Sequence, residues 1–149
     1  WKQEVAPLVD GRRVTWVGTL HGAERDRLVA TASAALFPID WNEPGGTAVT
    51  EALALGTPVV GYRRGCLPEL VEHGRTGLLV APGDEDALAE ATVRATELDP
   101  QDCRREAARR FTPARMAARY LRLYDQLQRR AGHPAPLRSA RAMGGRTPS

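Results

Sequence analysis

The most constraining feature of the sequence is a continuous apolar run, Pro58–Tyr62 (PVVGY). Such a run is typical of a strand that is buried on both faces. Gly77–Val80 (GLLV) repeats this character, and Ala34–Phe37 is a third apolar run, closed by Pro38. Val14–Val17 is β-branched and aromatic, and it predicts a further strand. Runs of this kind indicate a parallel sheet that is covered by helices.

Helical patterns alternate with these apolar runs. Gly56 is a stop signal because glycine is common just past a helix end. Thr112 followed by proline is an N-cap with proline at the first helical position. The alternation predicts an α/β fold, part of a Rossmann-like doubly wound parallel sheet. The usual strand order of such a sheet is 3-2-1-4-5-6, in which the strand at Val14 would be the third and the strand at Ala34 the fourth. The first and second strands, which would lie between these two in the sheet, are missing from the sequence. Helices are predicted at 23–33, 47–55, 84–98, 100–110 and 113–128.

Charge is distributed unevenly along the chain. The formal net charge is +3, with 21 basic and 18 acidic residues, but five arginines lie in residues 129–149, where there is no Asp or Glu. The remaining 16 basic residues do not exceed the 18 acidic ones. This balance argues against a nucleic-acid-binding surface, and binding through the Arg-rich tail is the least favoured alternative. We therefore predict a domain over residues 1–130 and a disordered basic tail over 131–149.

Cysteine usage and hydropathy indicate the compartment. Cys66 and Cys103 have neither metal-ligand spacing nor a secretory leader before them, so reduced thiols in a cytoplasmic protein are expected. No run of the chain approaches the length of a transmembrane segment.

The loop at 39–46 follows the second predicted strand, and ligands of open α/β sheets bind at the carboxyl ends of strands. The loop ends in Gly45 and Gly46 before a helix whose first turn has unpaired N–H groups and a positive dipole end. Two residues without β-carbons would let an oxyanion approach the backbone. A Gly-Gly pair considered by itself could also form a plain tight turn that binds no ligand.

Two glutamates bracket this helix start. Glu51 follows Glu43 after seven intervening residues. A carboxylate one turn into the helix can accept hydrogen bonds from both hydroxyls of a ribose diol, and Glu43 is placed to accept from hydroxyls of a second sugar. Each carboxylate taken alone is an ordinary solvated charge, and the combination is what favours a sugar-nucleotide site.

The stretch PIDWNEPGGTAVTEALALGTPVVGYRRGCLPELVEHGRTGLLV closely resembles the signature region of the family-four retaining glycosyltransferases (glycosyl transferases group one). That family has a Glu in an E-G/P-F-G loop, a second Glu after seven residues, then A-x-A-x-G-x-P-V-V, G-x-x-P-E and G-x-T-G. The resemblance covers about residues 1–128. The matching positions are Glu43, Pro44, Gly46, Glu51, Ala52, Ala54, Gly56, Pro58, Val59, Val60, Gly65, Pro68, Glu69, Gly74, Thr76 and Gly77.

The resemblance implies a role for each site residue. Glu43 would bind the donor sugar and is the candidate catalytic residue, while Glu51 would bind the ribose. Backbone N–H groups around Gly45, Gly46 and Thr47 would bind the diphosphate of a nucleotide sugar. Family members act without a metal or other cofactor, and retention is ascribed to same-face attack, so no protein nucleophile is expected.

The resemblance also implies a larger protein. The chain would be the C-terminal, donor-binding domain of a two-domain B-type glycosyltransferase, truncated at its N-terminal side. The acceptor-binding domain would be absent, as would a basic G-R…K-G pair for which Lys2 is no substitute. The enzyme would be cytoplasmic, metal-independent and bacterial, and could reach a membrane through the missing domain. Gly45 stands where the family usually has Phe, and a non-catalytic nucleotide-sugar-binding remnant is the alternative.

Four other side chains are not expected to take part in catalysis. His73 would lie in a tight turn before the last strand, and Cys66 would serve packing. Arg63 and Arg64 are most simply solvated loop charges, with a contact to the acceptor as the alternative.

Overall fold

The computed structural model describes residues 1–131, so all but the first residue of the predicted tail lies outside the described residues. The chain divides into two compact units, Trp1–Arg110 and Phe111–Ser149. The described part of the second unit contains one helix, α6 (Pro113–Arg130). Thr112 caps it by accepting a hydrogen bond from the Arg115 N–H at 3.3 Å, as the sequence predicts.

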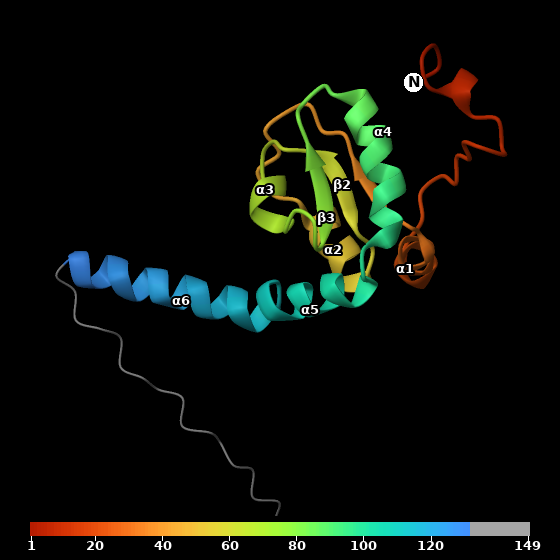
Figure 1. The fold of residues 1–149 in the computed structure, drawn as a ribbon. Coiled ribbons are helices and arrows are strands. Elements are labelled where there is room, and N and C mark those ends of the chain that lie inside the picture. The colour runs from red at the N-terminus through yellow and green to blue at the C-terminus, as the bar shows by residue number, and fades with distance from the viewer. Residues whose placement is uncertain (132–149) are drawn as a thin grey trace, which may run out of the picture. The chain divides into compact units, whose positions relative to one another are not determined.

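The first unit is built on a parallel sheet of strands β1 (Ala35–Phe37), β2 (Val59–Tyr62) and β3 (Gly77–Val80). The strand order is β1-β2-β3, and Figure 1 shows β2 beside β3. Every residue of the central strand is buried. The apolar runs therefore form buried parallel strands, and the predicted α/β class, part of a doubly wound sheet, is confirmed.

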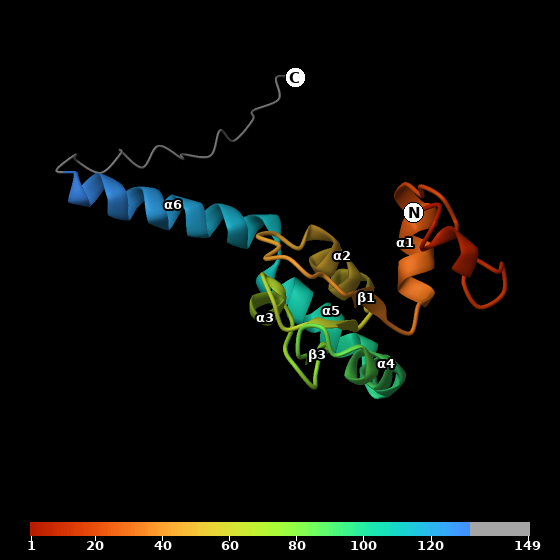
Figure 2. The same ribbon diagram turned by 90° about the horizontal axis from the view of Figure 1, so that it is seen from above.

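Helices cover both faces of the sheet. Val60 and Leu78 face α4, where they form a core with Ala91 and Ala95. Figure 2 shows α2 and α4 on opposite sides of the strands, and α5 packs against α2. The helices of this unit are α1 (Gly22–Thr31), α2 (Thr47–Leu55), α3 (Leu67–Leu70), α4 (Glu85–Arg94) and α5 (Pro100–Arg110), with 3-10 turns at Ala6–Leu8 and Ala95–Glu97.

The strand predicted at Val14–Val17 is wrong. Within residues 1–131 this segment pairs with no strand, and both valines are largely exposed. A strand requires a neighbour for its N–H and C=O groups, and β-branched composition cannot replace that neighbour. Trp16 packs instead against Trp1, with ring centroids 4.8 Å apart. The strand order 3-2-1-4-5-6 is accordingly not seen in the described residues.

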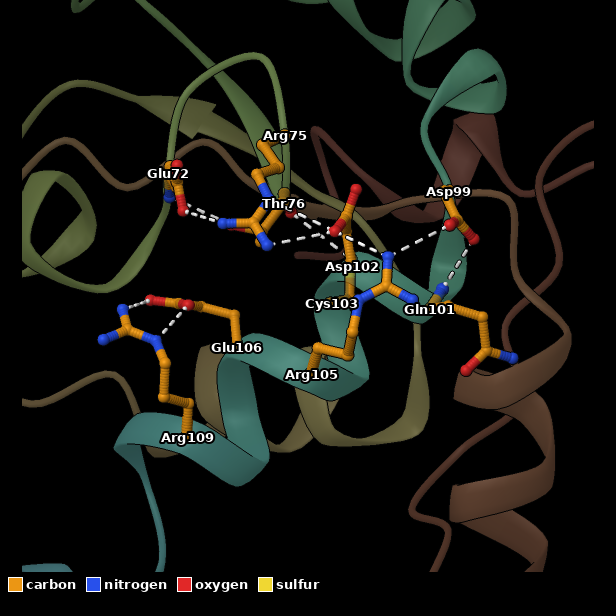
Figure 3. A network of polar contacts seen from close by, with 10 residues as sticks. All are labelled: Glu72, Arg75, Thr76, Asp99, Gln101, Asp102, Cys103, Arg105, Glu106 and Arg109. Atoms are coloured by element: carbon orange, nitrogen blue, oxygen red, sulfur yellow. Dashed lines mark hydrogen bonds and ion pairs between the residues drawn. The ribbon is translucent and has the colours of Figure 1, made fainter.

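Ion pairs connect α5 to the turn before β3 (Figure 3). Arg75 pairs with Glu72 at 2.9 Å and with Asp102 of α5 at 3.1 Å. The hydrogen bond from Arg105 and the contact with Arg75 lower the pKa of Asp102. Cys103 beside it is fully buried, and burial raises the pKa of its thiol to about 11, which fits a packing residue.

Glu106 is the buried carboxylate of α5. Only 2% of its surface is exposed, and it pairs with Arg109 at 2.7 Å and with Arg110 at 3.1 Å. Hydrogen bonds from these two guanidinium groups lower its pKa against the opposing effect of burial. Arg110 also donates to the Glu69 carbonyl of α3 at 2.5 Å, so α5 is joined to α3 as well.

Candidate functional site

The loop at 39–46 leads from β1 to α2, and it is fixed on the turn that follows β2. Arg64 donates from Nη1 to the Asp40 carbonyl at 2.6 Å and to Asp40 Oδ1 at 2.5 Å. The Cys66 N–H donates to the Glu43 carbonyl at 2.9 Å. A β-carbon at Gly65 would collide with the Glu43 backbone, and φ there is +56°, so the close approach requires glycine. Arg64 is therefore a loop anchor, not a solvated charge.

The Glu43 carboxylate is oriented by its own loop. Oε2 accepts a hydrogen bond from the Trp41 indole Nε1 at 3.1 Å, and Oε1 accepts one from the Gly45 N–H at 3.3 Å. The residue is partly exposed, so the carboxylate remains accessible to a ligand. Each oxygen has further lone pairs with which it could accept from sugar hydroxyls.

The two loop glycines have different surroundings. A β-carbon at Gly45 would meet no atom within 4 Å, so the absence of a side chain leaves open space beside Glu43. A β-carbon at Gly46 would lie 3.0 Å from Cys66 Sγ, Leu70 Cδ1 and Val49 Cγ2. Side chains therefore pack around the β-carbon position of Gly46, whereas the same position at Gly45 is open.

Helix α2 presents an N-terminus without a side-chain cap. Its N-cap is Gly46, and its first turn contains no acidic residue. The Thr47 N–H donates to the Gly45 carbonyl at 3.1 Å, a bond that a bound phosphate would have to replace. The backbone N–H groups of Ala48 and Val49 have no acceptor within the helix, because the helix contains no carbonyl one turn before them. This terminus combines free donors with the positive end of the helix dipole.

Glu51 lies one turn further along α2 and faces α1. Its Oε2 is 3.5 Å from Nη1 of Arg25, and Arg25 also donates to Asp26 Oδ1 at 3.1 and 2.8 Å. The carboxylates of Asp26 and Glu51 raise the pKa of Arg25. A cavity of about 140 Å³ lies here, lined by Arg25, Val29, Ala35, Phe37, Ala48, Glu51, Ala52 and Leu55.

Arg25 was not predicted as a site residue. Its approach to Glu51 depends on the packing of α1 on α2, a tertiary contact that has no signal in the local sequence.

The remaining candidates are structural, as expected. His73 accepts a hydrogen bond at Nδ1 from the Leu79 N–H at 3.0 Å, which holds the turn before β3, and Cys66 is buried. Within residues 1–131 no three His, Cys, Asp or Glu side chains are close enough together to hold a metal ion. The helices in that range are all too short or too polar to cross a membrane.

The chain is an α/β domain with a parallel sheet, and a glycine-led helix N-terminus and two glutamates follow its first strand. In open α/β sheets, the carboxyl edge is where ligands usually bind. The sequence profile of the family described as "Glycosyl transferases group 1" matches residues 1–97, and the chain belongs to this family. The resemblance found in the signature region is thereby confirmed.

Two curated proteins illustrate the similarity. It is 30% identical over 116 residues to the sulfoquinovosyl transferase SQD2 of Arabidopsis thaliana, covering 75% of the chain and 22% of the relative. It is 41% identical over 96 residues to the glycogen synthase of Mycobacterium tuberculosis, covering 64% and 23%. The chain thus spans less than a quarter of these two relatives.

Two solved structures share the fold. Sucrose-phosphate synthase from Thermosynechococcus elongatus superposes with a TM-score of 0.69 and 32% identity, over 80% of this chain and 31% of that one. AviGT4, a glycosyltransferase involved in avilamycin A biosynthesis, has a TM-score of 0.66 and 35% identity, over 82% and 38%. The expected B-type glycosyltransferase fold is confirmed by these neighbours.

Proposed function

We propose that the chain is the donor-binding part of a retaining glycosyltransferase that transfers a hexose from a nucleotide diphosphate sugar. The observation that carries this proposal is the Glu43 carboxylate, which the loop orients beside the uncapped N-terminus of α2. Glu51 lies one turn further along the same helix. Along the chain, Glu43 for the hexose comes first, the N-terminus of α2 for the diphosphate second and Glu51 for the ribose third. A nucleotide sugar has its hexose, diphosphate and ribose in this same order.

Each group of the donor then has a partner. The diphosphate binds the amides at Gly46 and Thr47, where the helix dipole favours negative charge. Glu43 accepts hydrogen bonds from the hexose hydroxyls, and Glu51 accepts from both ribose hydroxyls in place of its contact with Arg25.

The proposed chemistry follows the same-face course. The acceptor oxygen attacks the anomeric carbon as the bond from that carbon to the phosphate oxygen breaks, and the departing phosphate takes the acceptor proton. Backbone dipoles and basic side chains stabilise the negative charge that develops on the leaving group, so the proposed reaction uses neither a metal nor another cofactor.

We assign the acceptor site to an N-terminal domain of the complete protein, and the diphosphate-binding basic pair to an upstream segment that ends the first strand of the donor-binding domain. The low coverage of the relatives supports this assignment. The proposed enzyme is cytoplasmic, and any contact with a membrane is made by that other domain.

Activity of the full-length protein tests the proposal. We would incubate it with UDP-glucose, GDP-mannose and ADP-glucose and a panel of acceptors, with and without EDTA, and determine the anomeric configuration of the product by NMR. The proposal expects transfer with retention from one of these donors, insensitive to EDTA and strongly reduced in Glu43→Gln. Binding of a nucleotide sugar without transfer would instead identify a non-catalytic binding remnant, which the open space at Gly45 favours as the second candidate.

A further inference from the structure

Trp41 is the one loop side chain that contacts the Glu43 carboxylate and has no role in the proposed function. Its ring lies in the same loop, and 62% of the residue is exposed. A tryptophan left this open presents a large apolar face that a ligand could cover. Trp16, which is similarly exposed, differs because it packs against the ring of Trp1.

The orientation of the indole is defined by its polar edge. Nε1 of Trp41 donates to Glu43 Oε2 at 3.1 Å. The bond directs the N–H toward the carboxylate that would hold the hexose, so the ring is located at the sugar end of the site. A hydrogen bond to an ionised acceptor also restricts the carboxylate itself.

The backbone on both sides of Trp41 is anchored. Asp40 is held by Arg64, and the Glu43 carbonyl accepts from the Cys66 N–H. The Glu43 N–H donates in turn to the Trp41 carbonyl at 3.0 Å. These contacts tie the segment to the turn after β2, which is part of the sheet scaffold. The position of the Trp41 indole relative to the Glu43 carboxylate is therefore fixed by contacts with the rest of the fold.

The chemistry of a hexopyranose matches this pair. The ring of the sugar has polar hydroxyls at its rim and C–H groups on its faces, and the edge of an indole is polar while its face is apolar. A carboxylate that accepts from the hydroxyls and an aromatic face that covers the C–H groups together recognise both parts of the sugar. The open space at Gly45 leaves room for the ring beside them.

We propose that Trp41 is a specificity residue for the transferred hexose, with two separable actions: its indole face stacks on the sugar, and its N–H positions the Glu43 carboxylate. The inference rests on the proposed function of Glu43. It commits to the donor hexose as the occupant of the indole face.

Two variants of the full-length protein separate these actions. Trp41→Phe keeps an aromatic face but removes the N–H, so we expect kcat to fall about fivefold with little change in KM for the donor. Trp41→Leu removes the face as well, so we expect KM for the nucleotide sugar to rise in addition by about threefold to tenfold. Neither variant should change the Kd of the free nucleotide diphosphate, and Trp16→Phe should match the wild type in every assay.

A double-mutant cycle tests whether Trp41 acts through Glu43. We would measure kcat for transfer from the best donor in the panel for Trp41→Phe, Glu43→Gln and the double variant. If the indole N–H acts through the carboxylate, Trp41→Phe should cost nothing further once Glu43 is replaced. A full additional loss in the double variant would overturn the positioning action.

The remaining outcomes are also decisive. If Trp41→Leu weakens the free nucleotide diphosphate as much as the nucleotide sugar, the residue is structural and the inference is overturned. If Glu43→Gln impairs transfer while both Trp41 variants behave as wild type, the inference fails and the proposed function stands. If Glu43→Gln transfers hexose normally, the proposed role of Glu43 fails and this inference fails with it.

Discussion

Gly45 and Gly46 are adjacent in the loop, but only one of them is required for stability. At Gly46 an added β-carbon would press on three side chains at 3.0 Å, and alanine is also a poor N-cap. At Gly45 the same atom would meet open space, and the backbone there does not have a positive φ. We predict that Gly46→Ala destabilises the protein by about 1–2 kcal/mol, whereas Gly45→Ala is neutral or slightly stabilising.

Urea denaturation of the two full-length variants checks this prediction. Gly45→Ala is the matched control because it makes the same chemical change one residue away. Equal unfolding midpoints would show that Cys66, Leu70 and Val49 do not pack around Gly46.

The residue scale also shows why the site was only partly predictable. Glu43, Gly46 and Glu51 could be proposed from the sequence because a glycine-led helix start and its flanking carboxylates are local in sequence. Arg64 and Arg25 could not, because each acts on a residue at least 24 positions away, Asp40 and Glu51 respectively. Their roles arise only when the turn after β2 meets the loop and α1 meets α2.

At the scale of elements, α5 is connected to its neighbours through a buried charge. The Arg109 and Arg110 guanidinium groups lower the pKa of Glu106, so the folded state favours the ionised carboxylate. This contribution is complete above the ordinary glutamate pKa of about 4.3, and it is lost as the pH falls through the lowered pKa of the folded state. Stability from this cluster should therefore be constant near neutrality and decline in acid.

We predict that Glu106→Gln lowers the free energy of unfolding by about 1–2 kcal/mol at pH 7, and that the difference from the wild type shrinks below about pH 4. The estimate is modest because Arg109 is largely exposed and can be solvated after the change. Glu90→Gln, at an exposed position of α4, is the control. A difference that persists undiminished at pH 3 would mean that the ion pairs do not stabilise the fold.

Elements were predictable where their signals are local. Helix α2 begins and ends at the predicted residues, Thr47 and Leu55, because Gly46 and Gly56 mark both ends, and Gly56 adopts the left-handed conformation with φ of 90°. The Val14–Val17 strand failed because strand formation depends on a partner elsewhere in the chain. Helix α3 was not predicted, since its four residues are too few to show a helical period.

At the scale of the whole molecule, the described sheet has two strands with an unpaired edge, β1 and β3. Leu36 of β1 is 50% exposed, and in the other unit the α6 side chains Tyr120, Leu121, Tyr124 and Leu127 are each about half exposed. Unpaired edges and exposed apolar surface favour association. We therefore predict that residues 1–149, produced alone, aggregate or self-associate. A monodisperse monomer in light scattering, with a cooperative thermal transition, would contradict this.

The central claim is that Glu51 binds the nucleotide and Glu43 the sugar, and calorimetric titration of the full-length protein with the free nucleotide diphosphate tests it most directly. Since charge-assisted hydrogen bonds contribute about 1.5–3 kcal/mol each, Glu51→Ala should weaken the Kd about tenfold or more. Glu43→Ala should leave that Kd nearly unchanged while turnover of the nucleotide sugar falls. If Glu43→Ala loses the free nucleotide as severely as Glu51→Ala, or if neither change exceeds a few tenths of a kcal/mol, the assignment of the two glutamates is wrong.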